Sequence, residues 1–540
     1  MKTDRKNFIF FHGYDELLWH GYEKNGLLND FTGIRFCQSL LLPEEKKFNN
    51  LAAKGGSLSA LLSENSFPWY IDRLQGGCFI ENYRYDMSLV DSFENFYGFQ
   101  MHEWVSNMVS DYSKLKNLDT SEWNRESITR EIFRLFPFEN IFLEAATAEE
   151  FAELLPVPTA FEQLADNAKT LFKMRQKYTS GRLLPCDSFI MAPKLEFMYG
   201  AERVMPEIGA QTPGTKIQLA YARGMSRAYG KSYGAYYEPW GGEPFSTCNY
   251  HLSGENEWNI HSGDFPFESA GCSGGSSRSL QKRIFMYAYL SGAEFISEEW
   301  GVYNTFFDCG DFTLSPYGEV KRDFLRFAEK YPAGDFYAPA ALVLPSDMLV
   351  LPLGNLFGEL PYGDCQKQKN HTAACDALAG LMSASCSTFG NETSSLINSD
   401  LPDAFDIIHS DNEASFGRYR YLVDLTGDDT FAKTHPNAIT ADEAKRLLPD
   451  CMPVGVTGGV HWFVNKIPDG WYLTIFNNDG IERTVEHGER KIAEASRTAE
   501  IDLKGHTSLV PLEGIRDVAV RDGKYYVRIP AGEYLFAKII

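Results

Sequence analysis

The chain has 540 residues and a formal net charge of −22, with 44% hydrophobic and 23% charged residues. One hydrophobic core stops growing at about 250–300 residues, so we expect about two or three domains. The acidic balance and the absence of a basic stripe argue against nucleic acid or an anionic membrane as partner, because both require clustered Lys and Arg. The 14% aromatic share fits either flat ligands stacked on Trp and Tyr or an aromatic-rich core.

The first 335 residues alternate short apolar runs with longer amphipathic stretches, which is the pattern of repeated βα units around a parallel sheet. Residues 124–178 have helical spacing and predict inserted helices. Further helices are expected at 278–291 and 317–331, after which Pro332, Ala333 and Gly334 break the chain. The candidate strands predict a (β/α)8 TIM barrel over 1–335, and they lie at 7–11, 33–37, 68–72, 97–101, 187–191, 203–206, 232–237 and 293–297.

Residues 336–450 are predicted to form a small open α/β domain of the flavodoxin-like type. The region opens with the buried-strand run Ala340–Leu344, and two more strand-like segments follow at 405–408 and 421–425. A predicted helix at 371–385 and polar loops separate these strands, as in βα units.

The last region, 451–540, has a different pattern. Apolar and polar residues alternate at 471–476, 524–529 and 534–537, and the first of these segments runs into an Asn-Asp-Gly turn. Alternation with turn residues is typical of antiparallel strands. We therefore expect a C-terminal β-sandwich.

The ten cysteines are scattered singly, without the close pairs of a zinc site or a disulfide framework. This usage suits reduced thiols in the cytoplasm. The apolar run 8–11 is about half as long as the core of a signal peptide, and no later segment approaches the roughly 18 apolar residues of a membrane span. A cytoplasmic protein without a membrane partner is expected.

Acidic residues follow several predicted strands directly. In a parallel barrel the active site lies at the carboxyl ends of the strands, so these side chains are expected to point into one pocket. Each acid alone could equally form a rim salt bridge or lie near a helix N-terminus. As a set, with tryptophans close behind three of them, they favour catalysis and sugar binding. The acids are Glu103, Glu207, Glu238 and the pair Glu298-Glu299, and the tryptophans are Trp104, Trp240 and Trp300.

Hydrolysis of a glycosidic bond commonly uses two carboxyl groups. One is protonated and donates to the leaving oxygen, while the other is ionised and attacks the anomeric carbon or activates water. Separate barrel strands could hold such a pair rigidly. Glu103 and Glu238 are the favoured pair, but a shift of one strand would make Glu207 or Glu299 the partner of Glu103.

The segment Gly98–Asn107 resembles the fourth-strand signature of clan A retaining glycosidases, in which an Asn-Glu pair ends the strand and the Glu is the acid/base. The resemblance implies that Glu103 is the acid/base. His102 stands where the signature has Asn. Contact with the sugar 2-hydroxyl would therefore fall to Gln100, His102 or Asn107.

The stretch from Arg223 to Trp300 resembles the seventh and eighth units of family 42 type β-galactosidases. By this resemblance Glu238 is the nucleophile and Trp300 a sugar platform. The order of the three predicted domains is also similar, which implies a divergent clan A enzyme. In related barrels the middle α/β domain mediates contacts between subunits, so a homo-oligomer is expected.

Together these features predict a retaining glycoside hydrolase that acts on a small carbohydrate without a cofactor. The alternatives are a carbohydrate-binding barrel without catalysis and a transglycosidase, since one fold hosts many chemistries. The loop 249–264 holds two His but no convergent ligand set, so no metal is predicted. Tyr14 and Asp15 follow the first strand and could bind sugar or form a rim turn. The other expected substrate contacts are His102, Trp104, Glu207, Trp240, Glu299 and Trp300.

Overall fold

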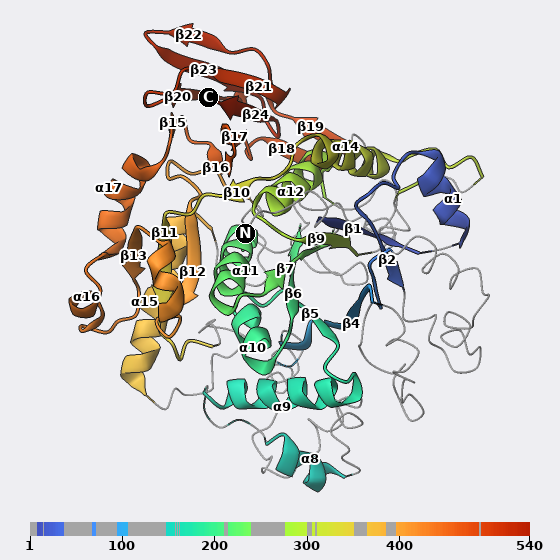
Figure 1. The fold of residues 1–540 in the computed structure, drawn as a ribbon, viewed down its shortest axis with the longest axis vertical. Coiled ribbons are helices and arrows are strands. Elements are labelled where there is room, and N and C mark those ends of the chain that lie inside the picture. The colour runs from blue at the N-terminus through green and yellow to red at the C-terminus, as the bar shows by residue number, and fades with distance from the viewer. Residues whose placement is uncertain are drawn as a thin grey trace.

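The computed structural model (Figure 1) describes the larger part of the chain. Trp240, Trp300 and Asp15, three of the expected substrate contacts, lie outside the described residues. The described residues are 8–14, 16–36, 67–71, 94–105, 108, 147–156, 158, 160, 162–209, 214–238, 276–299, 305–307, 310–349, 364–384, 396–484 and 488–540.

A closed parallel barrel occupies the N-terminal region, as the sequence predicts. The sheet runs β5-β4-β3-β2-β1-β9-β8-β6-β7, and an additional β5–β6 pairing closes it. Two short strands, β7 and β8, share the seventh barrel position. The strands are β1 (Ile9–Gly13), β2 (Thr32–Phe36), β3 (Trp69–Ile71), β4 (Phe96–His102), β5 (Leu183–Asp187), β6 (Arg203–Gly209), β7 (Ser232–Tyr233), β8 (Ala235–Glu238) and β9 (Phe295–Glu298).

The fifth strand was predicted at 187–191, and this prediction is wrong by four residues, since β5 ends at Asp187. The Asp187 side chain accepts a hydrogen bond from the Phe189 amide at 2.7 Å, which forms an Asx-type turn and ends the strand. The apolar run that follows is buried in the turn before α10, where Pro193 opens the helix. Burial of an apolar run therefore did not require a strand here.

Helices surround the barrel (Figure 1). The helices predicted at 278–291 and 317–331 are confirmed to within one residue at each end. Their starts are fixed by serine caps, because Ser277 accepts from the Leu280 amide and Ser315 from the Gly318 amide. The described helices are α1 (Glu16–Lys24), α8 (Ala148–Leu154), α9 (Gln163–Tyr178), α10 (Ala192–Tyr199), α11 (Thr215–Tyr229), α12 (Arg278–Leu290) and α14 (Pro316–Lys330).

Side chains alternate between the barrel interior and the layer of helices. A separate interior cluster contains residues from six of the eight strand positions, whereas their chain neighbours pack in the main core beneath the helices. The alternation decides which acidic residues can face inward at the carboxyl ends of the strands. The interior cluster consists of Ile9, Phe11, Tyr70, Leu184, Cys186, Met205, Tyr236 and Phe295.

The middle region contains a parallel four-stranded sheet in the order β12-β11-β13-β14, as expected of a small α/β domain. It lies against barrel helix α11, where a side chain at Gly224 would come within 2.1 Å of the Ile407 carbonyl oxygen. Only glycine permits this close approach. The elements are β11 (Ala340–Leu344), α15 (Cys365–Met382), β12 (Phe405–His409), η8 (Glu413–Arg418), β13 (Tyr421–Asp424), α16 (Phe431–Thr434), β14 (Ala438–Ile439) and α17 (Ala441–Cys451).

The C-terminal region has two larger antiparallel sheets, β10-β16-β17-β24-β21 and β15-β20-β23-β22, seen at the top of Figure 1. The C-terminal region is thus rich in antiparallel strands, as the sequence predicts. The strands are β10 (Asp335–Phe336), β15 (Gly455–Thr457), β16 (His461–Ile467), β17 (Gly470–Phe476), β18 (Ile481–Thr484), β19 (Gly488–Lys491), β20 (Arg497–Asp502), β21 (Leu509–Gly514), β22 (Ala519–Arg521), β23 (Lys524–Ile529) and β24 (Tyr534–Ile539), with η9 (Ala493–Ala495) between β19 and β20.

The predicted domain limits at 335 and 450 stay predictions. β10 follows the last barrel helix directly, yet it pairs antiparallel with β16, with Phe336 opposite Asn465. The five-stranded sheet thus takes its edge strand from the segment between the barrel and the middle region.

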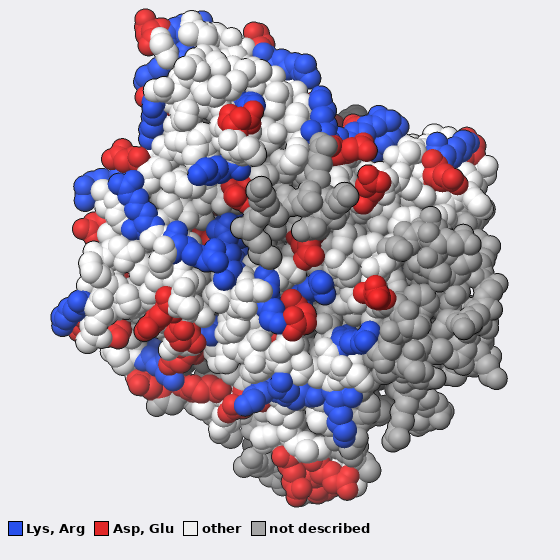
Figure 2. Space-filling model, viewed as in Figure 1, with Lys and Arg blue, Asp and Glu red and all other residues white. Residues whose placement is uncertain are grey.

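Among the described residues, none of the helices has the length and apolar character needed to cross a membrane. Acidic and basic side chains are mixed on the face shown in Figure 2. Acidic side chains gather at its lower end over α8, where Glu149, Glu150 and Glu153 are exposed.

Candidate active site

Three buried glutamates converge inside the barrel at the carboxyl ends of its strands. Glu207 lies in β6, Glu238 is the last residue of β8, and Glu299 directly follows β9. One carboxylate oxygen of each lies within 4.8 Å of the others, and each residue is at most 7% exposed. Three ionised carboxylates this close repel one another. The structure thus brings together three of the acids that the sequence singled out.

Close packing of β6 against β8 helps to set this spacing. Gly209 has φ +149°, and a side chain there would come within 2.2 Å of the Glu238 carbonyl oxygen. The pairing register places Gly209 opposite Glu238. A glycine is therefore required beside Glu238, because any Cβ would push the two strands apart.

Glu103 lies at the same end of the barrel, immediately after β4. Its amide donates a 2.7 Å hydrogen bond to the Cys186 carbonyl oxygen, and its φ of 46° is in the left-handed region. A non-glycine residue in this conformation costs about 1–2 kcal/mol. Such backbone strain is typical of functional sites, where the surrounding structure holds it in place.

His102 connects the end of β4 to the glutamate cluster. Its Nε2 lies 3.2 Å from Glu207 Oε1, and both side chains are buried. The imidazole also meets the Tyr236 ring edge-on, with the ring centroids 5.2 Å apart. His102 therefore lies inside the barrel and not on the rim.

Cys186 lies beside His102 and Glu207, and it was not among the predicted site residues. Its sulfur lies within 4.8 Å of ligand atoms of His102 and Glu207. Burial raises the pKa of the Cys186 thiol well above its usual value, and the nearby Glu207 carboxylate adds to the effect. The thiol is thus protonated at neutral pH. The misplaced fifth strand hid this residue, because Cys186 fell just before the predicted segment.

Glu298, the neighbour of Glu299, faces the other way. Its carboxylate accepts a hydrogen bond from the Tyr317 hydroxyl and forms an ion pair with Lys321, both on α14. All three side chains are fully buried. Glu298 therefore joins strand to helix outside the barrel, and only Glu299 of the pair enters the site.

Trp104 also points away from the site, into the layer of helices. Its Nε1 donates a 2.9 Å hydrogen bond to Glu196 Oε1 on α10, and its ring packs against Phe172 of α9. Burial raises the pKa of the Glu196 carboxyl to about 8. With 2% of its surface exposed, Trp104 does not suit the sugar contact expected of it.

Tyr14 follows β1 and is partly buried. Its ring packs against Trp19 and Phe36, at centroid distances of 5.7 and 5.4 Å. These contacts fit a wall of the barrel mouth.

The buried group could hold a divalent cation. Glu207 offers an oxygen to both sets of converging ligand atoms, one with Glu238 and Glu299, the other with His102 and Cys186. Carboxylate, imidazole and thiolate are common ligands of such ions. The expected absence of a metal stays a prediction.

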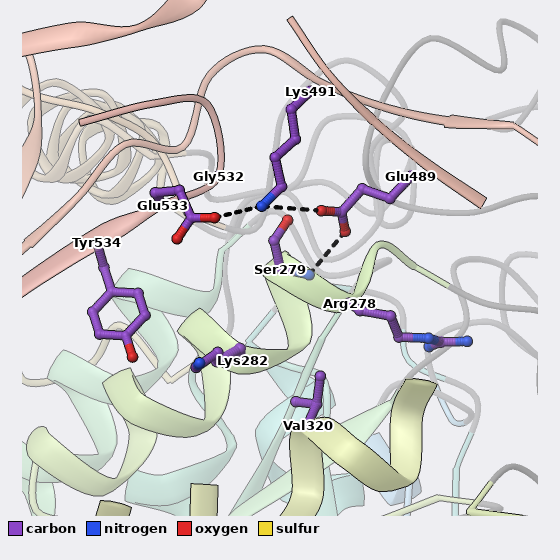
Figure 3. Close-up of a pocket in the computed structure, with 9 residues that line it drawn as sticks. All are labelled: Arg278, Ser279, Lys282, Val320, Glu489, Lys491, Gly532, Glu533 and Tyr534. Atoms are coloured by element: carbon purple, nitrogen blue, oxygen red, sulfur yellow. Dashed lines mark hydrogen bonds and ion pairs between the residues drawn. The ribbon is translucent and has the colours of Figure 1, made fainter. Parts of the chain in front are cut away.

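A hollow lies where α12 and α14 meet the C-terminal sheets (Figure 3). Its volume is about 230 Å³. Glu489 of β19 accepts a hydrogen bond from the Ser279 amide at the start of α12, and Lys491 bridges Glu489 and Glu533. These contacts attach the β18–β19 hairpin to the helix that follows the Glu238 strand.

No protein-family model matches the chain, and no curated protein matches it. Three solved structures are similar at low levels. An alpha-L-fucosidase isoenzyme 2 from Paenibacillus thiaminolyticus has 9% identity and a TM-score of 0.41, over 99% of both chains. GH5_18 from Streptomyces cattleya, in complex with GlcNAc, has 10% identity and a TM-score of 0.33, over 75% of this chain and 91% of that one.

The third is a rhamnosidase from Novosphingobium sp. PP1Y, with 10% identity and a TM-score of 0.32. The match covers 82% of this chain and 44% of the rhamnosidase, so the chain spans less than half of that protein. TM-scores of this size do not establish a family.

Proposed function

We propose that the protein is a retaining glycoside hydrolase that acts on a small carbohydrate. The observation that carries the proposal is the convergence of Glu207, Glu238 and Glu299 at the carboxyl end of a closed parallel barrel, with Glu103 directly after the fourth strand. Carboxyl groups on separate strands at this end are what hydrolysis of an acetal requires.

Glu238 is proposed as the nucleophile and Glu103 as the acid/base. A Glu238 oxygen bonds to the anomeric carbon while the bond to the leaving oxygen breaks, and Glu103 gives its proton to that oxygen. Water then attacks the anomeric carbon, Glu103 takes a proton from it, and Glu238 leaves. A neutral Glu103 and an ionised Glu238 are the starting state.

Glu207 and Glu299 are proposed to orient Glu238 and to bind sugar hydroxyls. In retaining enzymes the two catalytic carboxyl groups are about 5–5.5 Å apart. Because Glu207 and Glu299 each have an oxygen within 4.8 Å of a Glu238 oxygen, either could also serve as the partner of Glu238. Glu→Gln variants of all four glutamates will identify the pair, since only the catalytic two should abolish turnover.

The experiment is a panel of aryl glycosides, beginning with β-galactosides, tested on the wild type with and without a chelator. Glu238→Ala should lose turnover and regain it with azide as a glycosyl azide of inverted configuration. Glu103→Ala with azide should give retained configuration. Glu202→Gln is the matched control, because Glu202 is 70% exposed and pairs only with Lys231 in the described contacts.

Three outcomes would change the proposal. Sugar binding without turnover in the wild type would make the protein a carbohydrate-binding barrel. Transfer to a second sugar in preference to water would make it a transglycosidase. Loss of turnover with a chelator, restored by a divalent cation, would assign the glutamates to a metal.

The setting of the enzyme is also proposed. An acidic chain with scattered single cysteines fits a cytoplasmic enzyme that acts on imported glycosides, without nucleic acid or membrane partners. Assembly of identical subunits through the middle region is part of the same proposal. Sedimentation of the purified protein tests it, and a monomer at all concentrations would refute it.

A further inference from the structure

His102 contacts the glutamate cluster at one defined atom. Its Nε2 lies 3.2 Å from Glu207 Oε1, and Glu207 in turn lies within 4.8 Å of Glu238 and Glu299. We infer that His102 is a positioning residue that holds the Glu207 carboxylate beside the nucleophile Glu238. The inference rests on the proposed function and adds a residue that acts through another, without touching the reacting atoms.

The position of the imidazole is well determined. His102 is the last residue of β4, so its backbone belongs to the barrel sheet and pairs with Cys186 of β5. The ring is 3% exposed and meets the Tyr236 ring edge-on. Strand pairing and ring packing therefore limit the imidazole to a narrow range of orientations.

The contact spans two strands of the barrel. β5 lies between β4 and β6, and the interior side chain of β5 at this level is the small Cys186. A small residue there leaves room for His102 to reach Glu207 across the intervening strand. His102, which directly precedes Glu103, is thereby connected to Glu207, which lies next to Glu238.

The contacting atom makes the inference specific. Glutamine places its amide nitrogen the same number of bonds from Cα as histidine Nε2, whereas asparagine places its nitrogen one bond closer. A residue that acts through its contact with Glu207 Oε1 should thus be replaceable by Gln and not by Asn. A residue that contacts a sugar hydroxyl, as the Asn of the related signature does, should be replaceable by Asn.

The experiment compares His102→Gln, His102→Asn and His102→Leu on the best aryl glycoside of the wild type. We expect kcat to fall by about 100-fold in the Leu variant, which is the size of effect that a misplacement of about 1 Å can produce. KM should change little. The Gln variant should recover most of the loss, and the Asn variant should not.

Glu207→Gln and the double variant His102→Leu/Glu207→Gln complete the test. If His102 acts through Glu207, the double variant should be no slower than Glu207→Gln alone. Losses that multiply, or an Asn variant as active as the Gln variant, would overturn the inference. Thermal midpoints of all variants show whether each one folds, and the Gln and Asn pair remains informative if the Leu variant does not.

Different results would refute the proposed glycosidase function and the positioning role of His102. A wild type without glycosidase turnover would refute the proposed function and this inference with it. A wild type whose turnover depends on Glu103 and Glu238, but whose His102→Gln and His102→Leu variants are equally active, would refute only the role of His102.

Discussion

Two buried charged clusters in this molecule are arranged in opposite ways. Between barrel and middle region, Asp406 accepts hydrogen bonds from Arg223, Arg227 and Tyr419 at 2.6–2.8 Å, so one acid meets two cations. In the barrel mouth, three carboxylates meet one another. The first arrangement satisfies its charges and supports the fold. The second keeps like charges together, which is typical of sites selected for chemistry.

The largest expected effect is on turnover and concerns the mouth cluster. Glu238→Gln should lower kcat by several orders of magnitude, because it removes the carboxylate proposed as the nucleophile. The free energy of unfolding should change little, since Gln has nearly the same size as Glu and the substitution removes like-charge repulsion within the cluster. Kinetics and denaturant unfolding on the same sample check both parts. A variant that is strongly destabilised would contradict the comparison.

The second expected effect is on stability and concerns the interface cluster. Asp406→Asn removes the carboxylate that pairs with the buried Arg223 and the part-buried Arg227, and removing one partner of a buried pair costs about 3–5 kcal/mol. Denaturant unfolding measures this loss, with the exposed Glu202→Gln as control. Specific activity of the protein that stays folded should be near that of the wild type. A loss below about 1 kcal/mol would show that the Asp406 ion pairs contribute no more than exposed surface pairs do, and it would contradict this prediction.

Two buried carboxyl groups, Glu196 and Asp403, should give opposite dependences of stability on pH. Burial raises the pKa of Glu196 from 4.5 to about 8, so between these values the unfolded chain releases the proton that the folded chain keeps. The free energy of unfolding therefore falls as pH rises through this range. Glu196→Gln keeps an acceptor for Trp104 and should reduce this fall. Unfolding at about pH 5 and about pH 8 tests it, and an unchanged slope would reject it.

Acid should lower the free energy of unfolding through Asp403. This pH dependence is opposite to that expected from Glu196. Burial by itself would raise the pKa of Asp403, but a hydrogen bond with His461 and the positive charges of Lys216 and Arg223 hold this pKa at about 2. A lowered carboxyl pKa contributes stability above the unfolded value of 3.8 that is lost as pH falls toward about 2. Asp403→Asn should reduce the loss of stability over this range, as measured by acid titration of the circular dichroism signal.

The smallest expected effect lies at the hairpin that contacts α12. Lys491 is 42% exposed and pairs with Glu533, so Lys491→Met should change the free energy of unfolding by less than about 1 kcal/mol. Activity should not change. A larger loss would show that the hairpin supports the barrel more than its exposed charges indicate.

The sequence predicted the barrel because strands and helices alternate regularly, and it predicted the acids because they follow strand ends. Of the adjacent pair Glu298-Glu299, it was Glu299 that was expected in the site, and Glu299 is the one that lies with Glu207 and Glu238. Adjacent residues differ only in which face of the strand they take, and that is decided by pairing with β8. The same holds for Trp104, since its place after Glu103 in the sequence does not decide which face its ring takes, and its hydrogen bond to Glu196 places it among the helices.

Neither the place of Cys186 in the site nor the contact between His102 and Glu207 could be predicted from the sequence. The apolar run Phe189–Met191 looked like a strand, and only the turn formed by Asp187 shows that the strand had already ended. Contacts across an intervening strand depend on the stagger of the barrel, which periodicity does not report.

The pairing of β10 with β16 has a consequence for synthesis of the chain. β10 emerges from the ribosome with the barrel, but its partner strand follows only after the whole middle region. Until β16 has been synthesised, the backbone groups of β10 have no partner strand from the C-terminal sheet. The barrel therefore folds while β10 is still unpaired. Shortened forms that end after the middle region would keep that edge exposed, so we expect them to aggregate more readily than the full chain.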